Sequence, residues 1–176
     1  MELDPFSVIV NWNAIGTLVL GHRYDEALAQ ARHTLEISPD AELVNGSFLR
    51  IYENQGDYEK ALDLRDKFLP ERFGGSKLST EMRRMYTQSG PRGYWQAVLN
   101  FMLSMNHGNV AESKAMDVGL AYAYAHLGDR ERALAHLESA YASRSGDMLY
   151  LKVEPSFDPL HDDPRFQALV RRVGIP

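Results

Sequence analysis

Small and aromatic residues recur at a regular interval along this chain, on segments whose apolar positions have helical spacing. An alanine stands near the start of each segment, at Ala27, Ala61, Ala97 and Ala133, and successive alanines are 34, 36 and 36 residues apart. A tyrosine precedes the first three alanines by three residues, and the residue four positions after each alanine lies on the same helical face. This pattern predicts one helix that is repeated four times.

A second helical segment of about a dozen residues precedes each of these alanines, and a short turn joins the two segments. The turns are Gly21-His22-Arg23, Gln55-Gly56-Asp57, Gly90-Pro91-Arg92-Gly93 and Gly128-Asp129. The chain is therefore predicted to be all-α and to consist of helical hairpins. The small alanines let the two helices of a hairpin approach closely, and a bulky residue there would cost about 1–3 kcal/mol.

The tetratricopeptide repeat (TPR) is a helical hairpin with a period of about 34 residues, and the chain resembles this family. In the first hairpin, Ala27, Ala31 and Pro39 stand at positions that the TPR pattern defines. In the second hairpin, Arg65 does not match the residue type of the pattern at its position. In the fourth, the matching residues are Leu120, Ala121, Tyr124, Ala133 and Leu137. The third hairpin matches only in its second helix. The resemblance implies a right-handed superhelical solenoid of about four TPR-like hairpins plus a C-terminal capping helix.

The expected division of the chain follows from this period. It comprises a tail of a truncated preceding repeat (1–5), TPR-like repeats at 6–39, 40–74, 75–108 (degenerate) and 109–146, and an extended linker with a capping helix (147–176). Leu3-Asp4-Pro5 matches Ile37-Ser38-Pro39, so the native chain is expected to extend further toward the N-terminus. Asp163 is predicted to cap the last helix, with Pro164 at its first position and Gly174 after its end.

The segment from Tyr150 through Asp162-Asp163-Pro164-Arg165-Phe166 resembles the closing segment of repeat regions in many bacterial multidomain signalling proteins. Those proteins carry a winged-helix transcription regulator, a serine/threonine kinase or an adenylate cyclase domain ahead of the repeats. Gly93-Tyr94-Trp95 is similar to the same group. The resemblance implies a non-catalytic regulatory or protein-interaction region, and it transfers no catalytic residue.

The charge and the composition of the chain exclude several classes of ligand and location. With 24 acidic and 19 basic side chains the formal charge is −5, which disfavours direct binding of nucleic acid. The chain has no cysteine and no histidine cluster with ligand spacing, so neither a metal nor another cofactor is expected. The longest apolar stretch is too short to span a membrane, which predicts a cytoplasmic location, or a periplasmic one if an upstream part carries a transmembrane helix.

The resemblance also places a peptide or a partner helix in a groove formed by the first helices of the hairpins. The matching positions are Trp12, Gly16, Val19, Arg50, Glu53, Val118, Tyr122 and His126, with Tyr86 or Arg84 from the third hairpin according to its register. For Trp12 and Tyr122, packing between repeats is nearly as good an explanation as binding. The alternative function is a ligand-sensing domain that holds a small molecule between the third and fourth hairpins and controls an upstream effector domain.

The first helix is apolar nearly all round, and a preceding repeat would normally cover one of its faces. Without that repeat, Val8, Trp12, Ile15 and Val19 are expected to form an exposed patch. The patch predicts self-association through the N-terminal hairpin, most simply as a two-fold homodimer.

Overall fold

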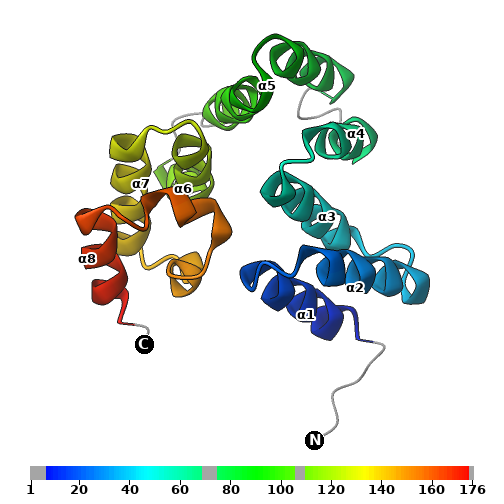
Figure 1. The fold of residues 1–176 in the computed structure, drawn as a ribbon, viewed down its shortest axis with the longest axis horizontal. Helices are drawn as coiled ribbons and strands as arrows, with labels where there is room; N and C mark the ends of the chain where they lie inside the picture. Colours follow the sequence, from blue (N-terminus) through cyan, green and yellow to red (C-terminus); the bar gives the residue numbers. More distant parts are fainter. Residues whose placement is uncertain (1–6, 69–74, 106–109, 175–176) are drawn as a thin grey trace, which may run out of the picture. The chain divides into compact units, whose positions relative to one another are not determined.

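All regular secondary structure is helical in the part of the chain that the computed structural model describes, residues 7–68, 75–105 and 110–174. The chain divides into two compact units, Met1–Ser79 and Thr80–Pro176 (Figure 1). The all-α prediction is confirmed for these residues. Leu3-Asp4-Pro5, which the sequence assigned to a preceding repeat, lies outside the described residues.

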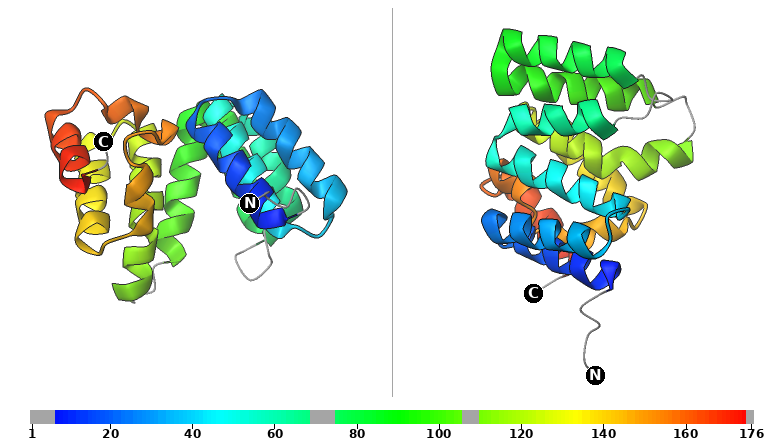
Figure 2. Two further views of the ribbon diagram at one scale, coloured as in Figure 1. Left: turned by 90° about the horizontal axis from the view of Figure 1, so that it is seen from below. Right: turned by 90° about the vertical axis from the view of Figure 1, so that its right-hand side faces the viewer.

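The first unit contains two helical hairpins. Helices α1 (Val8–Leu20) and α2 (Tyr24–Ile37) form the first hairpin, and α3 (Glu42–Gln55) and α4 (Tyr58–Phe68) form the second. The interval between the starts of α1 and α3 equals the interval between the starts of α2 and α4, and it is also the interval from Ala27 to Ala61. The right-hand view of Figure 2 shows these helices as successive layers, and α3 packs against both helices of the preceding hairpin.

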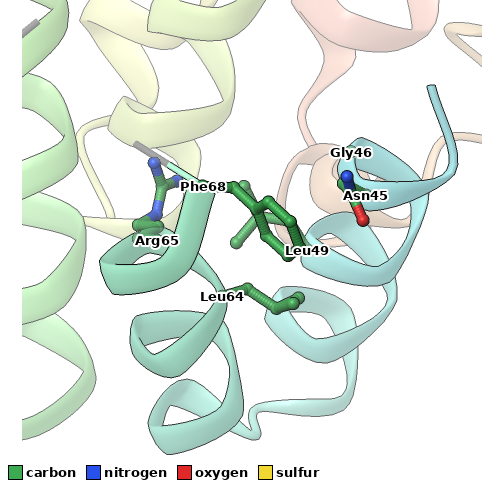
Figure 3. Close-up of a pocket in the computed structure, with 6 residues that line it drawn as sticks. All are labelled: Asn45, Gly46, Leu49, Leu64, Arg65 and Phe68. Atoms are coloured by element: carbon green, nitrogen blue, oxygen red, sulfur yellow. The ribbon is translucent and has the colours of Figure 1, made fainter. Parts of the chain in front are cut away.

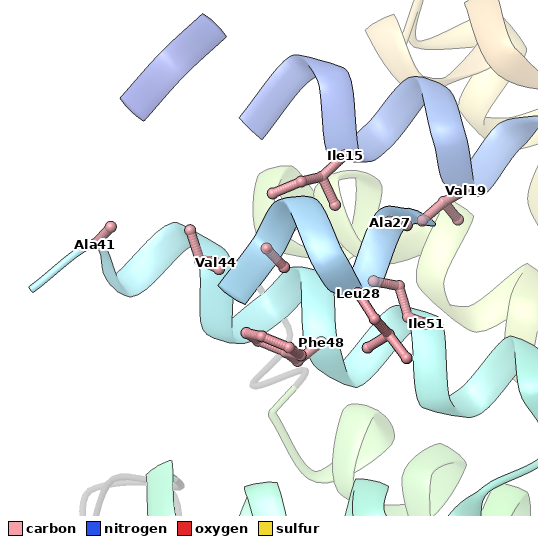
Figure 4. Packing of buried hydrophobic residues seen from close by; sticks show 9 residues of the cluster. Ile15, Val19, Ala27, Leu28, Ala41, Val44, Phe48 and Ile51 are labelled. Carbon is pink, nitrogen blue, oxygen red and sulfur yellow. The ribbon is translucent and has the colours of Figure 1, made fainter. Parts of the chain in front are cut away.

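The core of the first unit is built from α1, α2 and α3 (Figure 4). Ile15 and Val19 of α1 and Val44 and Ile51 of α3 are at most 1% exposed, with Ala27 of α2 among them. Because Ala27 carries only a methyl group, its neighbours can close over α2 at this point. This burial confirms the predicted role of Ala27 as a close-packed position.

The second unit begins in α5 (Gly75–Met105), which is interrupted at Gly90. Gly90 has φ 56° and ψ −141°, a conformation that is accessible mainly to glycine, so the chain turns there and a helix restarts at Pro91. A Cβ on Gly93 would lie 1.9 Å from the carbonyl oxygen of Met85, so the two halves of α5 approach each other closely at this glycine. The predicted turn at Gly90 is confirmed.

Helices α6 (Val110–His126) and α7 (Arg130–Ala142) form the last hairpin, and α8 (Pro164–Val173) packs on α7. Ala133 is fully buried at the start of α7. Asp163 accepts a hydrogen bond from the backbone N–H of Arg165 at 2.9 Å, Pro164 is the first residue of α8, and Gly174 ends it with φ 75°. The predicted cap of the last helix is therefore confirmed.

The segment between α7 and α8 differs from the predicted extended linker. It contains two 3-10 helices, η2 (Gly146–Tyr150) and η3 (Pro155–Leu160). Glu154 begins η3 by accepting a hydrogen bond from the backbone N–H of Ser156, and Phe157 is buried against Tyr122 and Phe166. Burial of this aromatic ring draws the proline-bounded segment into a compact turn structure.

Candidate functional site

The predicted groove positions on α1 do not share one environment. Trp12 is 40% exposed, and a Cβ on Gly16 would have no neighbour within 4 Å, so both lie at the surface. Val19 is 1% exposed and lies beside Ala27 in the core of the first unit (Figure 4). Its role in the structure is therefore packing between helices.

Arg50 and Glu53 are half-buried on α3, which packs against α1. The carboxylate of Glu53 accepts a hydrogen bond from Arg65 of α4 at 2.8 Å, and the two side chains are 15% and 13% exposed. Glu53 thus holds α4 through an ion pair. Within the first unit, Trp12 and Gly16 thus lie at the surface of α1, and Arg50 lies half-buried on the adjacent helix α3.

A hollow of about 140 Å³ lies between α3 and α4, next to this ion pair. Its lining is mostly apolar and consists of Asn45, Gly46, Leu49, Leu64, Arg65 and Phe68 (Figure 3). The volume suits one aliphatic side chain of a bound peptide.

Sequence reasoning missed the contribution of α4 to this hollow. Arg65 occupies, in the second hairpin, the position that the fully buried Ala31 occupies in the first. A charged residue at an apolar repeat position requires a partner of opposite charge nearby. That departure from the pattern was the available signal, and Glu53 on the preceding helix is the partner.

The groove positions predicted for the second unit are largely engaged in packing. Val118 is 6% exposed, and the ring of Tyr122 lies 4.8 Å from that of Phe157. Tyr86 is half-buried on the first half of α5. Arg84, the alternative in the other register, is exposed and forms a bidentate ion pair with Glu81.

His126 stacks on Trp95, with ring centroids 3.9 Å apart and the ring planes within 3° of parallel. Burial disfavours the charged imidazolium and lowers the pKa of His126 to about 4. Its Nε2 atom is buried without a hydrogen-bond partner among the described residues. The imidazole therefore acts as a neutral aromatic ring between α5 and α6 at pH 7.

A second histidine joins α6 to α7. Nδ1 of His136 lies 2.8 Å from Asp117, whose side chain is 5% exposed, and the imidazole stacks on Tyr124. Among the residues that the structure describes, no group of three or more histidine, aspartate or glutamate side chains could hold a metal ion. In the same part of the chain, no helix is both long and apolar enough to cross a membrane.

The exposed apolar residues of α1 differ from the predicted self-association patch. Ile15 and Val19 are buried, and Val8 is half-buried against the same core. The exposed large apolar residues of α1 are instead Ile9, at 55%, and Trp12, at 40%. Ile15 and Val19 are buried because α2 and α3 cover this side of α1 within the unit.

The structure thus groups Trp12, Gly16, Arg50 and Glu53 on one unit and Tyr86, Val118, Tyr122 and His126 on the other. No protein-family model matches the chain, and neither the curated proteins nor the solved structures include one that is significantly similar to it.

Proposed function

We propose that this protein is a non-catalytic protein-interaction module built from TPR-like hairpins, arranged as a right-handed superhelical solenoid with α8 as its capping helix. The observation that carries this proposal is the repetition of helix starts, because α3 follows α1 at the same interval at which α4 follows α2. The buried alanines Ala27, Ala61, Ala97 and Ala133 support the same register in four hairpins.

The surface of the first unit supports binding of a peptide or a partner helix. Trp12 supplies an exposed aromatic anchor and Arg50 a cation on the neighbouring helix, while the hollow beside Leu49 and Leu64 suits an apolar side chain. Aromatic and arginine side chains dominate the binding energy of many protein interfaces. The ligand that fits best is therefore a peptide with an aliphatic anchor and at least one carboxylate.

A phage-displayed peptide library selected on the full chain tests this function. We expect the affinity of a selected peptide to fall at least about tenfold on Arg50→Glu or Trp12→Ala, with the circular dichroism of both variants unchanged. Arg32→Glu is the matched charge-reversal control, because Arg32 is exposed on α2, a second helix of a hairpin. Selected peptides that lose affinity only with Arg32→Glu would place binding on the second helices and contradict the proposal.

The alternative, a small-molecule sensor, is favoured by one observation. The buried Nε2 of His126, which has no partner among the described residues, is the kind of atom that a bound polar ligand or water would satisfy. It lies on α6 beside Trp95 of α5, between the third and fourth hairpins, where the sensor hypothesis places its ligand.

We propose the place of this module in a larger protein from the resemblance of the chain to repeat regions of bacterial signalling proteins. In this proposal the module forms the C-terminal part of a cytoplasmic regulator and transmits partner binding to an upstream effector domain. A homodimer through the N-terminal hairpin would use Ile9 and Trp12, the exposed apolar residues of α1, as its contact. Light scattering of the chain over a wide concentration range, with Trp12→Ala as comparison, tests the dimer.

A further inference from the structure

A larger hollow of about 560 Å³ lies where α7 ends, bordered by η2 and the last turn of α8. Tyr141, Met148, Leu149 and Val173 contribute apolar surface, and Arg144 and Ser145 contribute polar atoms. The volume falls within the range of about 300–1,000 Å³ that is typical of small-molecule sites. Leu149 is 60% exposed at this hollow, so part of its apolar lining faces solvent.

Arg144 occupies a backbone position that suits glycine better than arginine. It has φ 58°, and the backbone N–H groups of Arg144 and Ser145 donate to the carbonyls of Tyr141 and Ala140. At the ends of α3, α6 and α8 the corresponding left-handed residues are glycines, namely Gly56, Gly128 and Gly174, whereas after α1 the corresponding residue is His22, with φ 56°. A side chain in this conformation costs stability relative to glycine, so the backbone geometry by itself does not explain an arginine here.

The guanidinium of Arg144 makes no ion pair or side-chain hydrogen bond with any residue in the described part of the chain. A neighbouring cation differs: Arg172 lies 4.5 Å above the ring of Tyr141 and is paired with Glu138 at 2.7 Å. Asp147, the carboxylate nearest to Arg144 in the sequence, lies near the hydroxyl of Ser145 and does not line the hollow. Arg144 is therefore an available cation beside an apolar surface.

We infer that this hollow binds a small amphipathic anion, in which a carboxylate pairs with Arg144 and an apolar body packs against Tyr141, Met148 and Val173. A guanidinium can donate two parallel hydrogen bonds to a carboxylate, which gives both affinity and orientation. The apolar body gains from leaving water, and an acyl chain or an aromatic ring would satisfy the site equally. This inference is independent of the proposed peptide-binding function.

Calorimetric titration of the full chain with sodium decanoate tests the site, with decan-1-ol as the uncharged comparison. We expect saturable binding of decanoate to one site and at least about tenfold weaker binding of decan-1-ol, which lacks the carboxylate. Arg144→Gly should weaken decanoate binding at least about tenfold while the melting temperature stays the same or rises, because glycine fits φ 58° without strain. This pairing of lost binding with retained stability separates a binding role from a structural one.

Three further variants complete the experiment. Arg144→Lys keeps the charge but cannot donate the two parallel hydrogen bonds, so it should bind decanoate more weakly than the wild type and more tightly than Arg144→Gly. Arg171→Ala removes an exposed cation of α8 that does not line the hollow, and it should leave decanoate binding unchanged. Ala142→Trp, at an exposed position in the lining, should abolish binding by filling the hollow. The inference is overturned if wild-type protein shows no saturable decanoate binding, or if Arg144→Gly or Ala142→Trp binds it as the wild type does.

Discussion

The guanidinium of Arg65 on α4 lies 2.8 Å from the carboxylate of Glu53 on α3, and this ion pair joins the two helices of the second hairpin. The side chains are only 13% and 15% exposed, so solvent screens their attraction weakly. In the first hairpin the position of Arg65 is held by Ala31, which packs in the core. The second hairpin therefore replaces an apolar contact by a largely buried ion pair.

We expect Arg65→Ala to destabilise the protein by about 2–4 kcal/mol, because it removes one partner of this pair and leaves the carboxylate of Glu53 in a poorly solvated place. Urea unfolding followed by circular dichroism measures the change. The double variant Arg65→Leu with Glu53→Leu should recover at least half of the loss, since it leaves no buried charge. A single variant as stable as the wild type would show that the pair contributes nothing.

The buried alanines make a second prediction. Ala133 is fully buried near the start of α7, whereas Ala135 on the same helix is exposed. Ala133→Leu should therefore destabilise the protein by about 1–3 kcal/mol through overpacking, and Ala135→Leu should change the free energy of unfolding by less than about 0.5 kcal/mol. Equal stability of the two variants would refute the hairpin register.

Two glycines within helices should respond in opposite directions to alanine. A Cβ on Gly93 would lie 1.9 Å from the carbonyl oxygen of Met85, so Gly93→Ala must push the two halves of α5 apart. Gly16 has open space around the corresponding position, and Gly16→Ala should stabilise α1 by about 0.5–1 kcal/mol. Thermal unfolding of both variants checks the pair. If Gly93→Ala has the same melting temperature as the wild type, the two halves of α5 do not approach each other as closely as described.

The lowered pKa of His126 predicts that the protein becomes less stable as the pH falls. Because its pKa is about 4 in the folded protein and about 6.5 when exposed, the unfolded chain binds a proton more readily between these values. Stability from this residue is therefore complete above pH 6.5, falls as the pH drops toward 4, and is then constant. The full loss is about 3–4 kcal/mol.

His126→Phe is the matched variant, since it keeps an aromatic ring against Trp95 and removes the titrating group. Urea unfolding of both proteins between pH 7 and pH 4 should show that the difference in their stability changes across this window. A difference that is the same at every pH would mean that His126 titrates as an exposed histidine.

Much of the local structure could be predicted because it depends on neighbours in the sequence. Gly56 and Gly90 permit left-handed backbone, Asp163 caps the helix that it precedes, and Ala61 and Ala133 mark the crossings within hairpins. Each of these effects acts over a few residues, so the residue types alone indicate it. The helices and most of the turns between them were therefore determined by the sequence itself.

The burial of individual residues and the contacts between helices depend on tertiary packing. The sequence shows that Ile15 and Val19 are apolar, but not whether they are buried. Contact with α2 and α3 places both residues in the core, whereas Ile9 and Trp12 on the same helix stay exposed. The pairing of Glu53 with Arg65 and the stacking of His126 on Trp95 likewise join different helices. Hydrophobic periodicity identifies the apolar face of a helix, but which neighbour covers that face depends on long-range packing, and only the tertiary structure determines it.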